Sequence, residues 1–403
     1  MTVFKMEKNH IYYFDNNATS RVAEEVAQAM DPFFHDLYAN PSSMHFFGGS
    51  LQQYIDKARE QVAALIGANP EEIIFTSCGT ESDSTAIYSA LRSQPGKKHF
   101  ITTQVEHPAV LTLAKTLESQ GYRITRLPVD GEGRLNLDDL KNAITPDTAL
   151  VSMMYANNET GVVFPIEEAA RIAYSRGVLF HTDAVQAAGK IAINMRESKV
   201  DMLSISGHKL HAPKGIGVLY VRKGTPFTPF VVGGHQEDGR RAGTENVPYI
   251  VGLGKAAELA LEHINIENTK VRELRDRLES GLVAAIPNTK VNGKEAERLP
   301  NTINICFEYI EGESILLMLS EKGICASSGS ACTSGSLDPS HVLRAMKVPQ
   351  TYAHGSIRLS LSVYNTQEEV DYLIKEFPPI VERLRKISPF ADGKPLFGTA
   401  EEH

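Results

Sequence analysis

Between residues 72 and 221 the sequence alternates short, nearly continuous apolar runs with stretches whose apolar side chains recur every three or four residues. Such runs are typical of strands buried on both faces, and the intervening periodicity is typical of amphipathic helices. The runs that fit strands are 72–76, 99–103, 123–129, 149–155, 178–182, 201–206 and 216–221. We therefore expect an α/β fold, with helices on both faces of a mostly parallel sheet of about seven strands.

The last two predicted strands depart from this parallel arrangement. Only residues 207–215 lie between them, whereas a crossover between parallel strands needs about a dozen residues or more. This pair is therefore expected to be antiparallel, which makes the sheet mixed.

The pattern changes beyond about residue 251. A long helical pattern runs from about 252 to 285 and is followed by short strand patterns at 302–307 and 356–361. We predict a large domain over residues 15–255 and a smaller α+β domain formed by residues 1–14 and 256–403.

Composition narrows the class of function. The net charge of the 403 residues is −8, which argues against direct binding to nucleic acid or to an anionic membrane. No apolar run is long enough for a transmembrane helix, and the first residues lack the apolar segment of a secretory signal, so we expect a cytoplasmic protein. The four cysteines fit no metal or redox spacing and are expected to be free thiols.

Polar side chains follow the predicted strands at their carboxyl ends, where open α/β sheets bind ligands. Lys209 lies in a glycine-containing loop, where burial would lower the pKa of the amine and make it a nucleophile; on this motif alone an ordinary surface-loop lysine is the favoured interpretation. Asp183 could hold the ring nitrogen of a pyridinium cofactor or simply cap a helix, and Gln186 could donate to the ring's phenolic oxygen.

Other strand ends carry complementary groups. Gly79 and Thr80 open a helical pattern, which suits either a bound phosphate or an ordinary capped turn. His107 could stack on a planar cofactor or only start a helix, and residues 157–161 could form a polar turn. Because strand ends meet at one rim of a sheet, we expect these groups to form one site.

Two further features lie in the second half of the chain. Cys332 is surrounded by small residues in a Gly- and Ser-rich segment, residues 326–336, which predicts an exposed, mobile thiol, whereas Cys306 and Cys325 are expected in buried positions. Arg358 lies in a predicted strand, where its guanidinium could bind a carboxylate or form a structural ion pair.

In their order along the chain, these motifs resemble cysteine desulfurases of the NifS/IscS type. The residues that carry the resemblance are 13–19, 79–82, 106–107, 157–161, 181–186, 206–209, 241–244 and 327–346. The amino-acid sequence of the last segment is more similar to the NifS branch of this family than to its housekeeping branch.

The resemblance implies a homodimeric fold-type I enzyme that uses pyridoxal 5′-phosphate (PLP). It implies that Lys209 carries PLP, that Asp183 and Gln186 contact the ring, and that His107 stacks on it and moves protons. The further cofactor-binding residues that it implies are Gly79, Thr80, Asn158, Ser206, Gly207, His208 and, from the other subunit, Thr244.

The resemblance also implies the reaction. Asn16, Asn158 and Arg358 would bind L-cysteine, and the Cys332 thiolate would take its sulfur as a persulfide while L-alanine leaves. The sulfur would pass to an acceptor protein for iron–sulfur cluster assembly, where Cys332 could transiently share a metal ligand position with a scaffold partner. The alternatives are another fold-type I PLP enzyme, such as a selenocysteine lyase or an aminotransferase, and an inactive assembly scaffold.

Overall fold

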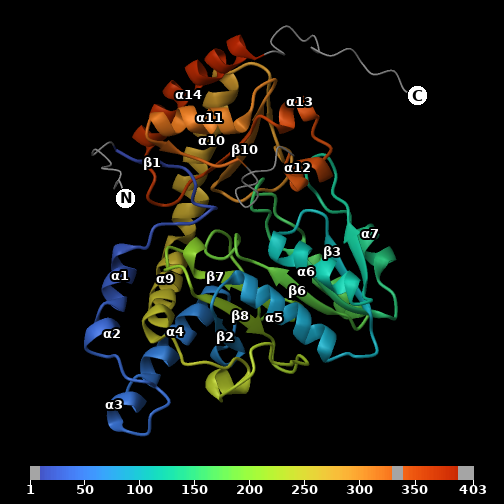
Figure 1. Ribbon diagram of the computed structural model, residues 1–403, viewed down its shortest axis with the longest axis vertical. Coiled ribbons are helices and arrows are strands. Elements are labelled where there is room, and N and C mark those ends of the chain that lie inside the picture. Colours follow the sequence, from blue (N-terminus) through green and yellow to red (C-terminus); the bar gives the residue numbers. More distant parts are fainter. Residues whose placement is uncertain (1–9, 329–338, 389–403) are drawn as a thin grey trace.

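The structure of the chain, a computed structural model, describes residues 10–328 and 339–388. Figure 1 shows a large twisted sheet with helices on both sides, and a second group of helices and short strands stacked at one end of it. Cys332, for which the sequence predicts an exposed loop, lies outside the described residues.

The large sheet has the predicted mixed arrangement. Its seven strands follow the order β2-β8-β7-β6-β5-β3-β4. The pairs from β4 to β7 are parallel, and β8 is antiparallel to both β7 and β2. The strands are β2 (Ile73–Thr76), β3 (His99–Thr103), β4 (Arg123–Leu127), β5 (Thr148–Met154), β6 (Leu179–Asp183), β7 (Met202–Ser206) and β8 (Gly217–Val221). The fold class and the antiparallel pair are therefore confirmed, with boundary shifts of one or two residues.

The two faces of the sheet pack against different helices. Ile74 belongs to a buried cluster with the apolar side chains of α5 (Gly79–Arg92) and α6 (Pro108–Ser119). Its neighbour Ile73 points to the other face, into the largest buried cluster, which includes side chains of α4 (Gln52–Leu65), α8 (Ile166–Ser175) and α9 (Val247–Ile266). Burial on both faces explains why these strands are apolar at nearly every position.

Shorter helical segments connect these elements. They are α1 (Glu24–Met30), α2 (Pro32–His35), α3 (Phe46–Gly49), α7 (Leu137–Ala143), η1 (Pro70–Glu72), η2 (Gly207–Lys209) and η3 (Gln236–Gly239). No helix in the described ranges is both long and apolar enough to cross a membrane.

The remaining strands form two small sheets around a separate apolar core. One sheet has the antiparallel order β12 (Ser356–Ser360), β10 (Thr302–Phe307), β9 (Thr289–Val291), and the other pairs β1 (Tyr12–Tyr13) in parallel with β11 (Ile324–Cys325). This core joins Phe14 to side chains of the neighbouring helices. The helices in this part of the chain are α10 (Arg272–Ala285), α11 (Gly312–Glu321), α12 (His341–Ala345), α13 (Gln350–Ala353) and α14 (Gln367–Ile387).

The long helical pattern predicted at 252–285 is present but begins earlier. Helix α9 starts at Val247, with a proline in its first turn, where the missing N–H is not needed. It continues through a π-helical segment, η4 (Glu267–Val271), into α10. Figure 1 shows this helix rising from the large sheet into the second group of elements.

Candidate active site

The carboxyl ends of the parallel strands meet at a cavity of about 270 Å³. Ten of the residues predicted from the sequence line it: Gly79, Thr80, His107, Asn158, Asp183, Gln186, Ser206, His208, Lys209 and Arg358. The first nine come from the ends of strands or from the loops that follow them, whereas Arg358 comes from β12 of the small sheet. The expectation that these polar groups share one rim is therefore correct.

Lys209 ends the short turn that follows β7. Its Nζ donates to the backbone carbonyls of Asn17 at 2.5 Å and Ala18 at 2.7 Å. These contacts orient the amine into the cavity and connect the N-terminal segment to the end of β7. The turn is tight because Gly207 packs against Ile216, where an added Cβ would lie 2.8 Å from that side chain. Gly207 thus shapes the turn and does not line the cavity.

Asp183 is the last residue of β6 and is buried. Its Oδ1 accepts a hydrogen bond from the backbone N–H of Val185 at 2.9 Å. Burial raises the pKa of this carboxyl, whereas His107, the Val185 amide and Lys209 act in the opposite direction. A cationic ring nitrogen placed beside Asp183 would offset the burial and stabilise the carboxylate.

Gln186 lies one turn beyond Asp183 and is buried. Its Nε2 donates to the carbonyl of Asn17 at 3.0 Å, and its Oε1 has no hydrogen bond partner within the described ranges. A buried polar atom without a partner is unfavourable by about 1–3 kcal/mol. Such an atom on the cavity wall indicates that a polar ligand satisfies it.

The start of α5 forms a pocket suited to an anion. The helix begins at Gly79, whose position allows close approach: an added Cβ would lie 2.9 Å from Cγ2 of Val185 and 3.4 Å from Cβ of Ser206. The unpaired backbone N–H groups and the positive end of the helix dipole favour a phosphate here. Thr80, Ser206 and His208 line the same part of the cavity wall.

His107 and Glu106 occupy the loop between β3 and α6. His107 precedes Pro108 and its Nδ1 accepts a hydrogen bond from the backbone N–H of Ala109 at 3.1 Å. Burial lowers the pKa of His107, so the ring is neutral near pH 7. Glu106 is fully buried beneath it, and burial raises its pKa to about 8 despite hydrogen bonds from Thr103 and the Met154 amide.

Arg358 reaches the cavity from β12 and is 2% exposed. One terminal nitrogen donates to the carbonyl of Asn158 at 3.1 Å and the other to Oδ1 of Asp15 at 2.8 Å. Its Nε has no hydrogen bond partner within the described ranges. Arg358 therefore forms a structural ion pair and also lies on the cavity wall, and some of its N–H groups remain for a second carboxylate.

Besides Gly207, three predicted residues are not among those that line this cavity. Asn16 points away from the main cavity and donates to the carbonyl of Ser360 at 2.9 Å. Thr244 is exposed in the loop that precedes α9 and does not line the cavity of its own chain. Cys332 falls in the gap between the described ranges.

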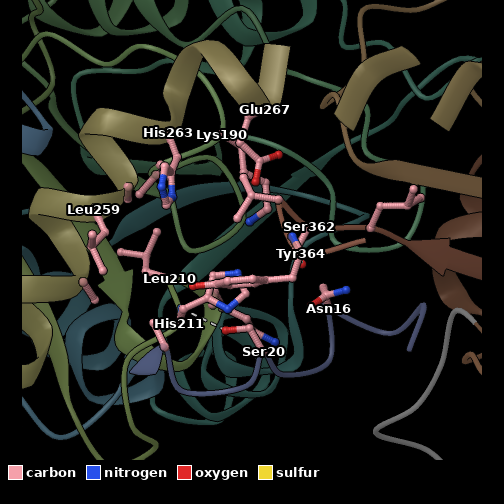
Figure 2. A pocket seen from close by; sticks show the side chains of 18 residues that line it. Asn16, Ser20, Lys190, Leu210, His211, Leu259, His263, Glu267, Ser362 and Tyr364 are labelled. Atoms are coloured by element: carbon pink, nitrogen blue, oxygen red, sulfur yellow. Dashed lines mark hydrogen bonds between the residues drawn. The ribbon is translucent and has the colours of Figure 1, made fainter. Parts of the chain in front are cut away.

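Asn16 instead lines a smaller cavity of about 30 Å³ (Figure 2), which Lys209 also lines. Lys190 and Glu267 face each other across this space, which suffices for an ordered water molecule. Burial raises the pKa of Glu267 to about 7 and lowers that of Lys190. Since Lys190 also donates to the carbonyl of Gln186 at 3.1 Å, this polar pair links the π-helical segment to the wall of the main cavity.

Ten further residues line the main cavity, and among these sequence reasoning assigned no individual role to the polar side chains of Asn17, Asp83, Glu159 and His341. Asp83 is fully buried on α5, and burial together with Asp183 raises its pKa well above the ordinary value. Glu159 is also buried, and its carboxylate accepts a hydrogen bond from the hydroxyl of Ser340. The signal that could have identified such residues is a charged or amide side chain inside an otherwise apolar helix face or motif. Such a side chain needs a partner or a ligand when it is buried.

The described cysteines are free thiols. Cys306 is buried in β10, as expected, and burial raises its pKa to about 11. Cys325 is only half-buried, since it lies in the two-residue strand β11, so the prediction of a buried position was too strong. Burial and Asp15 both raise its pKa, so this thiol remains protonated.

Comparison with known proteins decides the family. The model of the aminotransferase class-V family matches residues 12–373. The chain belongs to this family. A class-V relative from Trichormus azollae, named cysteine desulfurase, is 61% identical and covers 97% of this chain and 98% of its own length. The cysteine desulfurase NifS of Azotobacter vinelandii is 59% identical, with 94% of this chain and 95% of that protein covered.

Solved structures agree with this assignment. A structure described as a NifS-like protein has a TM-score of 0.87 and 41% identity, covering 93% of this chain and 100% of that one. The structure of SspA in complex with cysteine has a TM-score of 0.77 and 36% identity, with 88% and 99% covered. The predicted resemblance to the NifS-type cysteine desulfurases among the class-V aminotransferases is confirmed.

Proposed function

We propose that this chain is a PLP-dependent cysteine desulfurase that converts L-cysteine to L-alanine and holds the sulfur as a persulfide on Cys332. The observation that carries the proposal is the convergence of Lys209, Asp183 and Arg358 on one cavity. An amine, a carboxylate for a ring nitrogen and a guanidinium for a substrate carboxylate are the groups that PLP chemistry on an amino acid requires. The names of the relatives support the same reaction.

The cavity fits the cofactor. The start of α5, with Thr80, Ser206 and His208, would hold the phosphate. Because Gly79 has no side chain, Val185 and Ser206 can pack close to this helix start. Asp183 would face the ring nitrogen, and the NH2 group of Gln186, which in this structure donates to the carbonyl of Asn17, would donate to the ring's phenolic oxygen. When bound, PLP supplies an electron sink for the charge that develops at the substrate Cα.

The protein's own residues bind and orient the substrate. Arg358 and Asn158 would hold its carboxylate, which points the amino group toward Lys209. Lys209 is the residue that would hold PLP covalently and, once released, receive the Cα proton. Its position between the carbonyls of Asn17 and Ala18 keeps the amine at the cavity wall.

Sulfur transfer needs Cys332 near the substrate. Ser327, which precedes Cys332 in the sequence, is held beside the cavity, because its backbone forms two hydrogen bonds with the backbone of Arg358. On the other side of the gap, Ser340 binds Glu159. A chain spans at most about 3.3–3.6 Å per residue, so the short stretches between these two tethers and Cys332 would allow its thiol to reach the substrate-binding residues. The thiolate would form a bond to the substrate sulfur and the carbon–sulfur bond would break, with its electron pair staying on the substrate carbon, which takes up a proton as alanine leaves.

We further infer a cytoplasmic homodimer that passes sulfur to an acceptor protein of iron–sulfur cluster assembly. The exposed Thr244 lies away from its own cavity, in agreement with a role at the phosphate of a partner subunit. Such a contact would place part of each site on the other copy of the chain.

Product analysis tests the proposal. Purified protein with PLP and L-cysteine should form alanine, together with sulfide when a thiol reductant releases the persulfide. A keto acid in place of alanine would identify an aminotransferase, and exclusive turnover of selenocysteine would identify a lyase of that substrate. A colourless protein without turnover would support the inactive scaffold.

A further inference from the structure

His341 is a third histidine of the cavity wall, beside His107 and His208, and the proposed reaction has not yet used it. It is the first residue of α12, directly after Ser340, and it lines the cavity together with His107, Asn158 and Arg358. Its position is fixed from two sides. Its own ring nitrogen Nε2 lies 2.9 Å from the carbonyl oxygen of Glu106, and the preceding Ser340 is bound to Glu159.

The hydrogen bond of His341 determines where its proton lies. A backbone carbonyl only accepts, so Nε2 must carry the hydrogen in the neutral ring. The other nitrogen, Nδ1, is then a lone-pair acceptor, and it has no hydrogen bond partner within the described ranges. Burial lowers the pKa of His341, the hydrogen bond to the carbonyl of Glu106 acts in the opposite direction, and Arg344 and His107 add to the lowering, so the ring is neutral near pH 7 and able to take a proton.

His107 has the opposite arrangement. Its Nδ1 accepts the hydrogen bond from the backbone N–H of Ala109, and a backbone amide only donates. The proton of the neutral ring therefore lies on Nε2, and the lone pair is already in use. His107 can accept a second proton only by breaking the bond that caps α6, which stabilises the helix by about 1 kcal/mol. Of these two rings, His107 offers a donor and His341 offers an acceptor.

We infer that Nδ1 of His341 accepts the proton that the substrate's ammonium group loses before its amine reacts. The inference rests on the proposed function, since it assigns a step to the same cavity. Amino acids arrive as ammonium ions, and only the free amine is a nucleophile. With the substrate carboxylate on Arg358 and Asn158, the amino group lies between them and Lys209, in the cavity that His341 lines.

The step is a simple proton transfer. One N–H bond of the ammonium breaks and its electron pair stays on the substrate nitrogen, while an N–H bond forms at Nδ1 and the imidazole becomes a cation. No oxidant or further reactant is needed. The titratable and charged groups near this ring are Glu106 and His107 in the β3–α6 loop and Arg344 on its own helix, and those that line the rest of the cavity are Asp83, Glu159, Asp183, His208, Lys209 and Arg358.

His341→Gln in the PLP-loaded enzyme tests the inference. Glutamine keeps a side-chain N–H for the carbonyl of Glu106 but has no site for a proton. We expect unchanged PLP content and a fall in kcat/KM for L-cysteine of about 100-fold or more, the usual range for general acid–base catalysis. The acidic limb of the wild-type pH profile, where a base becomes protonated and rates fall, should flatten in the variant. His341→Ala should be partly rescued by added imidazole, which a merely structural role would not explain.

Two controls separate this inference from the proposed function. His354→Gln changes a histidine outside the cavity that pairs with Glu311, and it should leave kcat/KM and the pH profile unchanged. The absorbance change on adding L-alanine follows amine exchange at the cofactor without any thiol chemistry, and His341→Gln should slow it as much as it slows turnover of cysteine.

The outcomes differ for the two proposals. If the wild type shows normal amine exchange with L-alanine but forms no alanine from L-cysteine, the proposed desulfurase reaction is refuted and the role of His341 is not. Wild-type rates and an unchanged pH profile in His341→Gln would defeat the role of His341. In ¹⁵N-histidine-labelled protein without PLP, His341 should show the form protonated on Nε2, and a proton on Nδ1 would equally overturn the inference.

Discussion

Replacement of Arg358 by lysine separates the two roles that the structure gives this residue. Arg358 is 2% exposed and divides its terminal nitrogens between the carbonyl of Asn158 and the carboxylate of Asp15, while Nε has no partner within the described ranges. Lysine keeps the positive charge but has a single nitrogen. It can pair with Asp15 or reach a substrate carboxylate, and it cannot reproduce the planar two-bond contact.

The size of the effect follows from the contacts that are lost. A hydrogen bond to a charged group contributes about 1.5–3 kcal/mol. With about 1.4 kcal/mol for each factor of ten, the loss of one such bond to the substrate carboxylate corresponds to an increase in KM of roughly 10- to 150-fold. The lost bond to the carbonyl of Asn158 should lower the free energy of unfolding by about 1 kcal/mol.

Steady-state kinetics with L-cysteine, PLP absorbance and urea unfolding measure these effects. Asp15→Asn is the matched control, because it removes the other half of the ion pair without touching the proposed carboxylate site. If Arg358 were only a structural partner of Asp15, both variants would lose stability and both would keep KM. A normal KM in Arg358→Lys would therefore refute the assignment, as would loss of PLP with normal cysteine binding.

Four further variants test the remaining assignments. Lys209→Ala should lose its visible PLP absorbance on dialysis and stop turnover, and normal turnover would remove Lys209 from the mechanism. Asp183→Asn keeps the shape but not the charge, so PLP binding should weaken and turnover should fall, with each tenfold loss in rate equal to about 1.4 kcal/mol; an unchanged rate would contradict its role. Cys332→Ser should retain PLP and fail to form a persulfide, whereas Cys325→Ser should keep most of its activity and lose about 1 kcal/mol of stability. Sulfur mapped by mass spectrometry to the peptide of Cys325 would reverse that choice.

Much of the large sheet was predictable because its strands are buried on both faces. All seven residues of β5 are buried, and such a strand leaves a continuous apolar run in the sequence. The antiparallel arrangement of β8 followed from the length of the connection alone. The carboxyl-end rule then placed Asp183 and Lys209 at one rim, and the structure brings them into one cavity.

Other features depend on contacts that sequence spacing does not contain. Asn17 enters the site through hydrogen bonds to Thr302 at 2.9 Å and from Asn301 at 3.1 Å, both almost three hundred residues away. Asp83 was hidden in a helix whose start alone looked functional. Cys325 was expected to be buried because of its apolar neighbour Ile324, yet alternate residues of an edge strand face opposite sides.

The position of His341 shows what a structure adds to a list of motif residues. The sequence draws attention to His107, which follows the end of a predicted strand, and assigns no role to His341. The backbone groups that meet the rings make them different: an amide donor occupies the lone pair of His107, and a carbonyl acceptor fixes the proton of His341. This difference arises from the backbone groups of Ala109 and Glu106. Because the side chains of these two residues take no part in it, no pattern of side chains along the sequence could have predicted it.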